Sequence, residues 1–293
     1  MSNRVAIVTC EAFIPDGLDE DRLLLQACAR AGVGAELVSW SDRTVDWDGY
    51  DLAVLRSTWD YTGRRAEFLN WVAAVPRLCN PVSVVSANTD KRYLADLARI
   101  GVPVVPTSFA APGEWASLPA TGDFIVKPAV GAGSRGAGRF DAGLDGELDR
   151  ATAHVGDLHA KGVTAMVQPY LDGVDTYGET ALIFIEGRFS HAIRKGRMLA
   201  EGVQYAFDGP ALFIPEQISA RTPDAAEIAL GTRVVGHFAE LAGEPLLYAR
   251  IDLLPSPDGP VVVEAELTEP SLFLDHDAES ADRLAAAIAD RIL

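Results

Sequence analysis

The sequence predicts an α/β fold in which a small doubly wound unit is followed by two further lobes. Strand-like apolar runs alternate with helical spacing in the first 80 residues, which is the order of a parallel sheet flanked by helices. Beyond residue 176 the pattern changes to antiparallel hairpins. Apolar residues, 48% of the chain, are spread evenly and no long linker or repeat interrupts them. We therefore expect one compact body with units at residues 1–87, 88–170 and 171–293.

The first unit is predicted from the strands RVAIVTC, AELVSW and DLAVLRS, with a helix between the first two. Ligands of a doubly wound sheet bind beyond the carboxyl ends of its strands. The segment RSTWDY, residues 56–61, follows such an end, so it is a candidate substrate site with Arg56 and Ser57 as polar contacts. Packing is the better explanation for Trp59 and Tyr61.

The second unit is predicted to begin with a helix over NTDKRYLADLARIG, residues 88–101, capped by Asn88 and Thr89 and ended by Gly101. The strands VPVVPT, FIVKPAV and TAMVQPYL follow, and GELDRATAHVGDLHA has the spacing of an amphipathic helix between the last two. These elements predict a small α/β lobe.

The third unit is predicted to contain two hairpins. GETALIFIE and RFSHAIRKGR flank a Glu186-Gly187 turn, which is typical of a tight hairpin. A long helix is expected from about Asp224 to Leu241, and LLYARIDLL and VVVEAEL then flank the loop PSPDGP. An Ala-rich helix is expected at the end.

Charge and composition limit the kind of partner. The net charge of −17 argues against a general nucleic-acid binder, which needs a basic surface, and favours a small-molecule substrate. There is no apolar stretch of membrane length and no signal peptide pattern, so we expect a cytoplasmic protein without a membrane partner. Three widely spaced cysteines indicate neither a disulfide framework nor a zinc site. The oligomeric state stays open, a homo-oligomer included.

The segment GAGSRGAG, residues 131–138, contains a literal G-x-G-x-x-G. A dinucleotide fingerprint should open a helix, whereas this segment continues as a loop. We favour a flap between antiparallel strands whose N–H groups close over nucleotide phosphates, with Arg135 adding charge. A mobile surface loop is the alternative that glycine content leaves open. Lys91 near a helix start and Lys127 at a strand end would neutralise nucleotide oxygens, and a solvated surface lysine is the alternative for each.

The strongest signal is the second hairpin of the third unit. Arg250 and Asp252 are two residues apart in one strand, as are Glu264 and Glu266 in the next, so each pair shares a face. If the loop is centred on Asp258, Asp252 faces Glu264 and Arg250 faces Glu266. Opposed like charges cost stability, so we expect a compensating cation, and Mg²⁺ between nucleotide oxygens is one. An exposed face with an Arg–Glu pair is the alternative.

These residues, in this order, resemble the ATP-grasp superfamily over about residues 88–270. The resemblance implies an ATP-grasp fold in which two lobes clamp ATP and Mg²⁺. The sequence departs from the family at Glu266, where asparagine is common, and at Pro169, which removes one N–H from the adenine hinge VQPYL. The resemblance assigns the phosphates to Lys91 and Lys127, the flap to Gly133, Ser134, Arg135 and Gly136, adenine to Gln168, Tyr170 and Leu171, the ribose to Asp175, and the metal to Asp252, Glu264 and Glu266.

Within the superfamily, RSTWDY, HAIRKG at 191–196 and TEPSLFL at 268–274 resemble the ligase branch that includes cycloserine synthetase. This implies an antibiotic-biosynthesis enzyme that activates an amino-acid carboxylate as an acyl phosphate. A nitrogen of the same molecule then closes a ring, as in the conversion of O-ureidoserine to an isoxazolidinone. In this scheme Lys127 and Arg250 stabilise the transferring phosphoryl group, Arg194 or Lys195 stabilises the tetrahedral oxyanion, and Arg56, Ser57, Glu179, His191 and Ser271 contact the substrate.

Two other functions fit the same nucleotide site. One is a two-substrate ligase that joins a carboxylate to a separate amine. The other is an ATP-binding sensor that has lost turnover, although the lysines and carboxylates named above are all retained.

Overall fold

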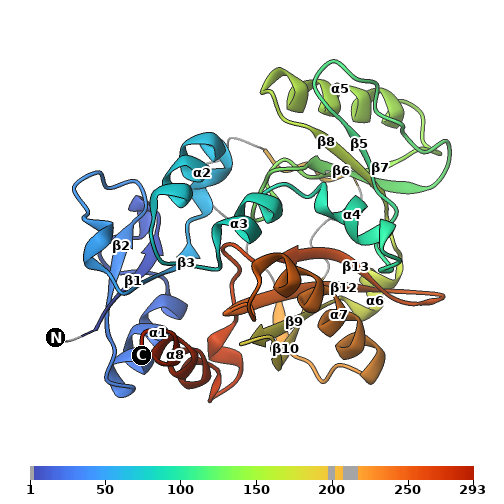
Figure 1. The fold of residues 1–293 in the computed structure, drawn as a ribbon. Helices are drawn as coiled ribbons and strands as arrows, with labels where there is room; N and C mark the ends of the chain where they lie inside the picture. The colour runs from blue at the N-terminus through green and yellow to red at the C-terminus, as the bar shows by residue number, and fades with distance from the viewer. Residues whose placement is uncertain (1–2, 197–201, 207–216) are drawn as a thin grey trace.

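A computed structural model describes residues 3–196, 202–206 and 217–293 of the chain. Its strands form three separate sheets, and helices cover them (Figure 1). The α/β fold class expected from the sequence is confirmed. Within the described residues, no helix combines the length and apolar character that crossing a bilayer requires.

The first sheet is parallel, with strand order β2-β1-β3-β4. Its central strands β1 and β3 are buried on both faces, as parallel strands usually are, so the predicted doubly wound unit is confirmed. The elements are β1 (Arg4–Thr9), η1 (Glu11–Phe13), α1 (Asp19–Arg30), β2 (Gly34–Ser39), η2 (Trp47–Gly49), β3 (Leu52–Ser57), η3 (Trp59–Gly63), α2 (Arg65–Ala74), β4 (Leu78–Cys79) and α3 (Val82–Asn88).

The helix predicted from Asn88 begins later, and the predicted cap is wrong. Asn88 is the last residue of α3, and the next helix is α4 (Tyr93–Arg99). The Asn88 side chain donates to the Ala265 carbonyl and accepts from the Leu267 N–H, so it fixes the end of a distant strand instead of capping a helix. The boundary proposed after residue 87 falls at the end of α3.

The second sheet is antiparallel, with order β5-β8-β6-β7, and α5 covers one face (Figure 1). The predicted helix and the strands FIVKPAV and TAMVQPYL are confirmed. The strand predicted over VPVVPT is wrong, because Pro103 and Pro106 lack the N–H that a strand requires, and only Val104 makes an isolated bridge there. The elements are β5 (Ser108–Ala110), β6 (Asp123–Pro128), β7 (Gly138–Asp141), α5 (Glu147–Ala160) and β8 (Ala165–Pro169).

The third sheet has the order β11-β10-β9-β12-β13 and is antiparallel. The Glu186-Gly187 turn is confirmed, and both residues have positive φ (50° and 69°), as a two-residue hairpin of this type requires. The elements are α6 (Gly173–Tyr177), β9 (Glu179–Ile185), β10 (Arg188–Lys195), β11 (Ile218–Ala220), α7 (Ala225–Ala242), β12 (Tyr248–Ser256), β13 (Gly259–Glu266), η4 (Leu274–His276) and α8 (Ser280–Arg291).

The first and third sheets share one apolar core. Helix α8 returns from the third sheet to pack against α1 (Figure 1). Tyr248 is fully buried on β12. Its hydroxyl group is within hydrogen-bond distance, as donor, of the carbonyls of Leu55, Thr268 and Cys79, at 2.7, 2.8 and 3.3 Å. These contacts fix the first sheet against the strands that carry the acidic residues. The proposed division of the chain into three units stays a prediction.

Candidate nucleotide and substrate site

A cavity of about 530 Å³ lies where the three sheets approach one another. This is the size range of small-molecule sites. Its walls come from the flap residues Gly131–Arg135, the hinge after β8, the ends of β12 and β13, and the η3 segment of the first unit. A site that draws on all parts of the chain is suited to bringing two reactants together.

The predicted pairing of β12 and β13 is confirmed. Arg250 lies opposite Glu266 and Asp252 lies opposite Glu264. The geometry behind it differs from the expectation, because the turn is the two-residue Pro257-Asp258 between the paired Ser256 and Gly259. A bulge at Val263 adds one residue to β13, and this shift restores the pairing that a loop centred on Asp258 would have given.

The three carboxylates are compensated by cations of the protein itself. Asp252 accepts from Arg250 Nε at 2.9 Å and from Lys195 Nζ at 2.6 Å. Glu264 pairs with Lys91 at 2.9 Å, and Glu266 pairs with Arg250. The compensating charge expected beside these acids is thus present in the protein itself, since each has a lysine or arginine partner in this structure. The metal role predicted for the three carboxylates stays a prediction.

The pKa values follow from burial and these pairings. Burial would raise the pKa of Asp252, but Arg250 and Lys195 outweigh it and hold the pKa at about 2. For Glu264, Lys91 and then Lys127 outweigh burial, and its pKa is lowered. Burial raises the pKa of Glu266 to about 7, because Arg250 only partly offsets it. The wall is thus divided between two firmly ionised carboxylates and one that titrates near neutrality.

The glycine-rich flap joins β6 to β7 as expected, and no helix follows it. The dinucleotide interpretation of G-x-G-x-x-G is therefore excluded. Ser134 and the glycines on both sides of it have left-handed φ values between 58° and 73° for residues 133, 134 and 136, the conformation that turns successive N–H groups toward an anion. Arg135 anchors the flap to η3 by donating to Thr62 Oγ1 at 2.8 Å and to the Trp59 carbonyl at 3.2 Å.

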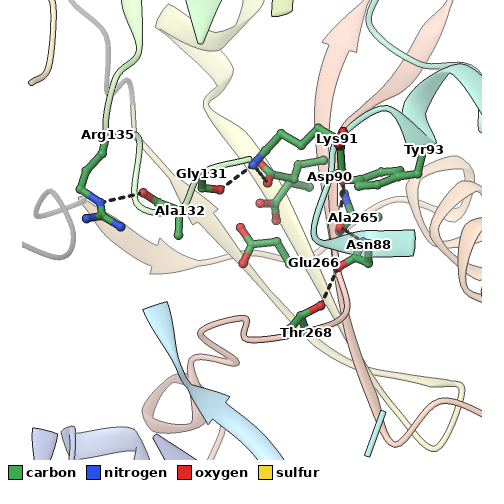
Figure 2. A network of polar contacts seen from close by, with 12 residues as sticks. Asn88, Asp90, Lys91, Tyr93, Gly131, Ala132, Arg135, Ala265, Glu266 and Thr268 are labelled. Carbon is green, nitrogen blue, oxygen red and sulfur yellow. Dashed lines mark hydrogen bonds and ion pairs between the residues drawn. The ribbon is translucent and has the colours of Figure 1, made fainter. Parts of the chain in front are cut away.

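The two predicted phosphate lysines line the cavity together with the flap residues. Lys91 Nζ donates to the Gly131 carbonyl at 2.7 Å, and Figure 2 shows it reaching across from the turn before α4 with Glu266 projecting nearby. Burial lowers the pKa of Lys127, and its ammonium makes no recorded hydrogen bond or ion pair with the described residues. Lys127 is thus available to a phosphate.

The hinge places Gln168, Tyr170 and Leu171 in the cavity wall, where the resemblance puts adenine contacts. Gln168 Nε2 donates to Thr107 Oγ1 at 2.9 Å. Asp175 is not a wall residue, since its Oδ1 bonds the Tyr170 hydroxyl at 2.5 Å. The ribose contact predicted for Asp175 stays a prediction.

Four predicted substrate or catalytic residues do not reach the cavity. Arg194 alternates with Lys195 along β10, so with Lys195 in the cavity Arg194 points away and donates to the carbonyls of Thr176 and Tyr177. His191 is covered by the segment after β13 and bonds the Leu272 carbonyl at 2.8 Å. The other two are held by the first turn of α1: Arg56 pairs with Glu20 at 2.5 Å, and Ser57 donates to Asp21 at 2.8 Å.

Glu179, Lys195 and Ser271 do line the cavity, as the sequence predicted. So do Trp59 and Tyr61, for which packing was the favoured role. Four acidic residues that sequence reasoning missed also line it, namely Asp19, Glu20, Glu269 and Asp275. Glu269 stands in the apolar segment TEPSLFL. A carboxylate in such a segment is costly to bury, and its presence there is the sequence feature that could have identified Glu269 as a candidate site residue.

The donor set fits a magnesium-bound nucleotide. Mg²⁺ in nucleotide sites is held by one or two carboxylates together with phosphate oxygens. Within residues 3–196, 202–206 and 217–293, no three His, Cys, Asp or Glu side chains are grouped as a complete metal site. Asp252 and Glu264, opposite each other across the ladder, supply two carboxylates, and Lys91 and Lys127 supply positive charge for phosphates.

The chain is similar to proteins of one family over nearly its whole length. A family model described as D-cycloserine synthetase DcsG, N-terminal domain, matches residues 5–80. The cycloserine biosynthesis protein DcsG of Streptomyces lavendulae is 38% identical over 305 residues, which cover 98% of each chain. The crystal structure of D-cycloserine synthetase DcsG has a TM-score of 0.88 at 38% identity, over 99% of this chain and 100% of that one.

A more distant likeness concerns the fold alone. The D-alanine–D-alanine ligase of Bacillus anthracis, solved as a complex with ATP, has a TM-score of 0.66 at 14% identity, over 99% of this chain and 97% of that one.

Proposed function

Because the chain belongs to the D-cycloserine synthetase family of ATP-grasp ligases, we propose that it activates the carboxylate of an O-ureido-D-serine-type amino acid with ATP and closes it to a cyclic amide. The observation that carries the proposal is one cavity lined by Lys91 and Lys127, by the facing carboxylates of Asp252 and Glu264, and by residues of the first unit. Such a cavity can hold the nucleotide and the carboxylate together.

Lys91, Lys127 and the flap amides would bind the phosphates, and Asp252 and Glu264 would hold Mg²⁺, with Glu266 as a third ligand. Mg²⁺ when bound would neutralise the charge that develops on the transferring phosphoryl group. Lys195 and Arg250 now pair with Asp252. Release of Lys195 toward the substrate would free an oxygen of Asp252 and place a cation beside the reacting carboxyl group.

The substrate would lie between these residues and the η3 segment. Its carboxylate attacks the γ-phosphate, giving an acyl phosphate and ADP. Arg250 donates to the Ser271 carbonyl at 3.1 Å, so the guanidinium connects the phosphate end of the cavity to Ser271. A nitrogen of the same molecule then attacks the acyl carbon and phosphate departs. Lys195 would stabilise the oxyanion, since Arg194 points away from the cavity.

Incubation with ATP, Mg²⁺ and O-ureido-D-serine, followed by ADP release and the mass of the product, tests this proposal. We expect stoichiometric ADP and a cyclic product. Dependence on an added amine would indicate a two-substrate ligase, and an absence of ADP with every carboxylate tried would indicate a sensor; either result would overturn the proposal.

The metal assignment has its own test in Glu264→Gln. Removing the charge should lower Mg²⁺-dependent turnover by at least about 100-fold, since it deletes a ligand and leaves Lys91 without its partner. Glu279→Gln is the matched control, because that side chain is 85% exposed. Near-normal turnover of Glu264→Gln would contradict the ligand role.

A further inference from the structure

Glu269 differs from the other acidic residues around the ends of β9, β12 and β13. Glu179, Asp252, Glu264 and Glu266 each form an ion pair with a lysine or arginine. Glu269 is only 8% exposed and lines the same cavity, yet none of the ion pairs found among the described residues includes it. A buried carboxyl without a cation is costly, and its retention beside the reacting groups calls for a chemical reason.

The first unit holds Glu269 in place. The Tyr61 hydroxyl hydrogen-bonds the Glu269 side chain, and Trp59 Nε1 donates to the Glu269 carbonyl at 2.9 Å. Both partners belong to η3, the segment on which Arg135 anchors the flap. Glu269 is thus fixed by the same turn that receives the flap.

The chain before Glu269 is equally fixed. Leu267 N–H donates to Asn88 Oδ1 at 2.8 Å, and Thr268 Oγ1 approaches the same oxygen at 3.3 Å (Figure 2). After it, the Ser271 carbonyl accepts from Arg250. Glu269 therefore stands in the chain between Glu266 and Ser271, both of which contact Arg250, and it lines the cavity that holds this guanidinium.

Burial is the main reason that the pKa of Glu269 is raised to about 8, and Glu266 raises it next. The Tyr61 hydrogen bond and then Lys91 lower it, and Glu264 raises it again. These are the groups that face Glu269 from η3, from β13 and from the turn before α4. A carboxyl group in this range exchanges its proton near neutral pH, as a general base requires.

We propose that Glu269 is the general base of the ring-closing step, taking the proton from the nitrogen that attacks the acyl carbon. This rests on the function proposed above. The nitrogen lone pair forms the C–N bond, and the C–O bond to the phosphate breaks with its electron pair leaving on phosphate. The N–H proton goes to a carboxylate oxygen of Glu269, which becomes neutral and is held by Tyr61.

The test separates activation from ring closure. Hydroxylamine traps an acyl phosphate as a hydroxamate, so the wild type, Glu269→Gln and the exposed control Glu279→Gln are compared for hydroxamate and for cyclic product. We expect Glu269→Gln to form hydroxamate within about threefold of the wild-type rate but product at least about 100-fold more slowly. Glutamine keeps the shape and can donate a hydrogen bond, so only the base is lost.

A pH profile gives a readout that a purely structural role would not move. Product formation by the wild type should rise as Glu269 loses its proton, and Tyr61→Phe, which removes a hydrogen bond to the carboxylate, should displace that rise to higher pH. Product formation by Glu269→Gln at the wild-type rate, or equal loss of hydroxamate and product in a variant that still melts cooperatively, would overturn the assignment. If the wild type forms no hydroxamate from O-ureido-D-serine, the proposed function itself fails.

Discussion

Replacing Glu269 by glutamine should make the protein more stable at alkaline pH, even though it removes a residue that we place in the reaction. In the folded chain the pKa of this carboxyl is about 8, against an ordinary value of 4.5, chiefly because of burial. Between these values the folded state holds more protons than the unfolded state. The free energy of unfolding therefore falls as the pH rises through this window.

The size of the effect follows from the same values. Moving a carboxyl pKa from 4.5 to about 8 corresponds to about 5 kcal/mol, because each pH unit is worth about 1.4 kcal/mol. Relaxation and water entry relieve part of this cost, so we expect Glu269→Gln to gain about 2 to 5 kcal/mol at pH 9 and almost nothing at pH 4.5. In a chain of this size that is a rise in Tm of about 4 to 10 °C.

Calorimetric melting without nucleotide, at pH 5 and at pH 9, measures this difference. Glu279→Gln carries the same chemical change on an 85% exposed side chain and should leave Tm unchanged at both pH values. A Tm difference between Glu269→Gln and the wild type that is the same at pH 5 and pH 9 would refute the reasoning, since the cost would then not come from a buried charge.

Three further predictions test the architecture. Gly231→Ala would place a methyl group 2.7 Å from Leu182 Cδ1, and overpacking of this kind should lower the free energy of unfolding by about 1 to 3 kcal/mol; an unchanged urea midpoint would contradict the packing. Tyr248→Phe leaves buried carbonyls without their donor and should lower the free energy of unfolding by about 1 to 3 kcal/mol in the same measurement. An unchanged urea midpoint would contradict the role of Tyr248 in fixing the first sheet against the third. Deletion of Val263 should remove the bulge and leave Glu264 opposite Asp252 and Glu266 opposite Arg250, because Val263 is the unpaired residue between Val262 and Glu264; Mg²⁺-dependent ATP binding by calorimetry should therefore survive, and its loss would contradict this register.

Local features of this chain were open to prediction because neighbouring residues alone decide them. The Glu186-Gly187 hairpin, α5 and α7 depend on turn chemistry, capping and periodicity within a few residues. The shared face of Glu264 and Glu266 is likewise a consequence of strand pleating. The parallel first sheet followed from the order of its elements.

Predictions from local sequence were wrong where contacts with residues distant in the chain determine the structure. Asn88 and Thr89 have the chemistry of a helix cap, yet Asn88 binds the backbone at the end of β13, because satisfying buried backbone groups outweighs a cap exposed to water. His191 and Arg194 share a strand with Lys195, but only Lys195 lines the cavity. The segment beyond β13 covers His191, and the alternation of the strand turns Arg194 away.

The sequence by itself determined the inventory of this protein: its α/β elements, its glycine-rich loop, Lys91 and Lys127, and the residues Arg250, Asp252, Glu264 and Glu266 in facing pairs. Only the tertiary structure decided how their charges are balanced. The bulge at Val263 sets the register of β13 against β12. Arg250, Lys195 and Lys91 compensate three carboxylates, whereas the contact of Glu269 is a hydrogen bond from Tyr61. Ion pairing and burial depend on residues far apart in the chain, and periodicity carries no information about them.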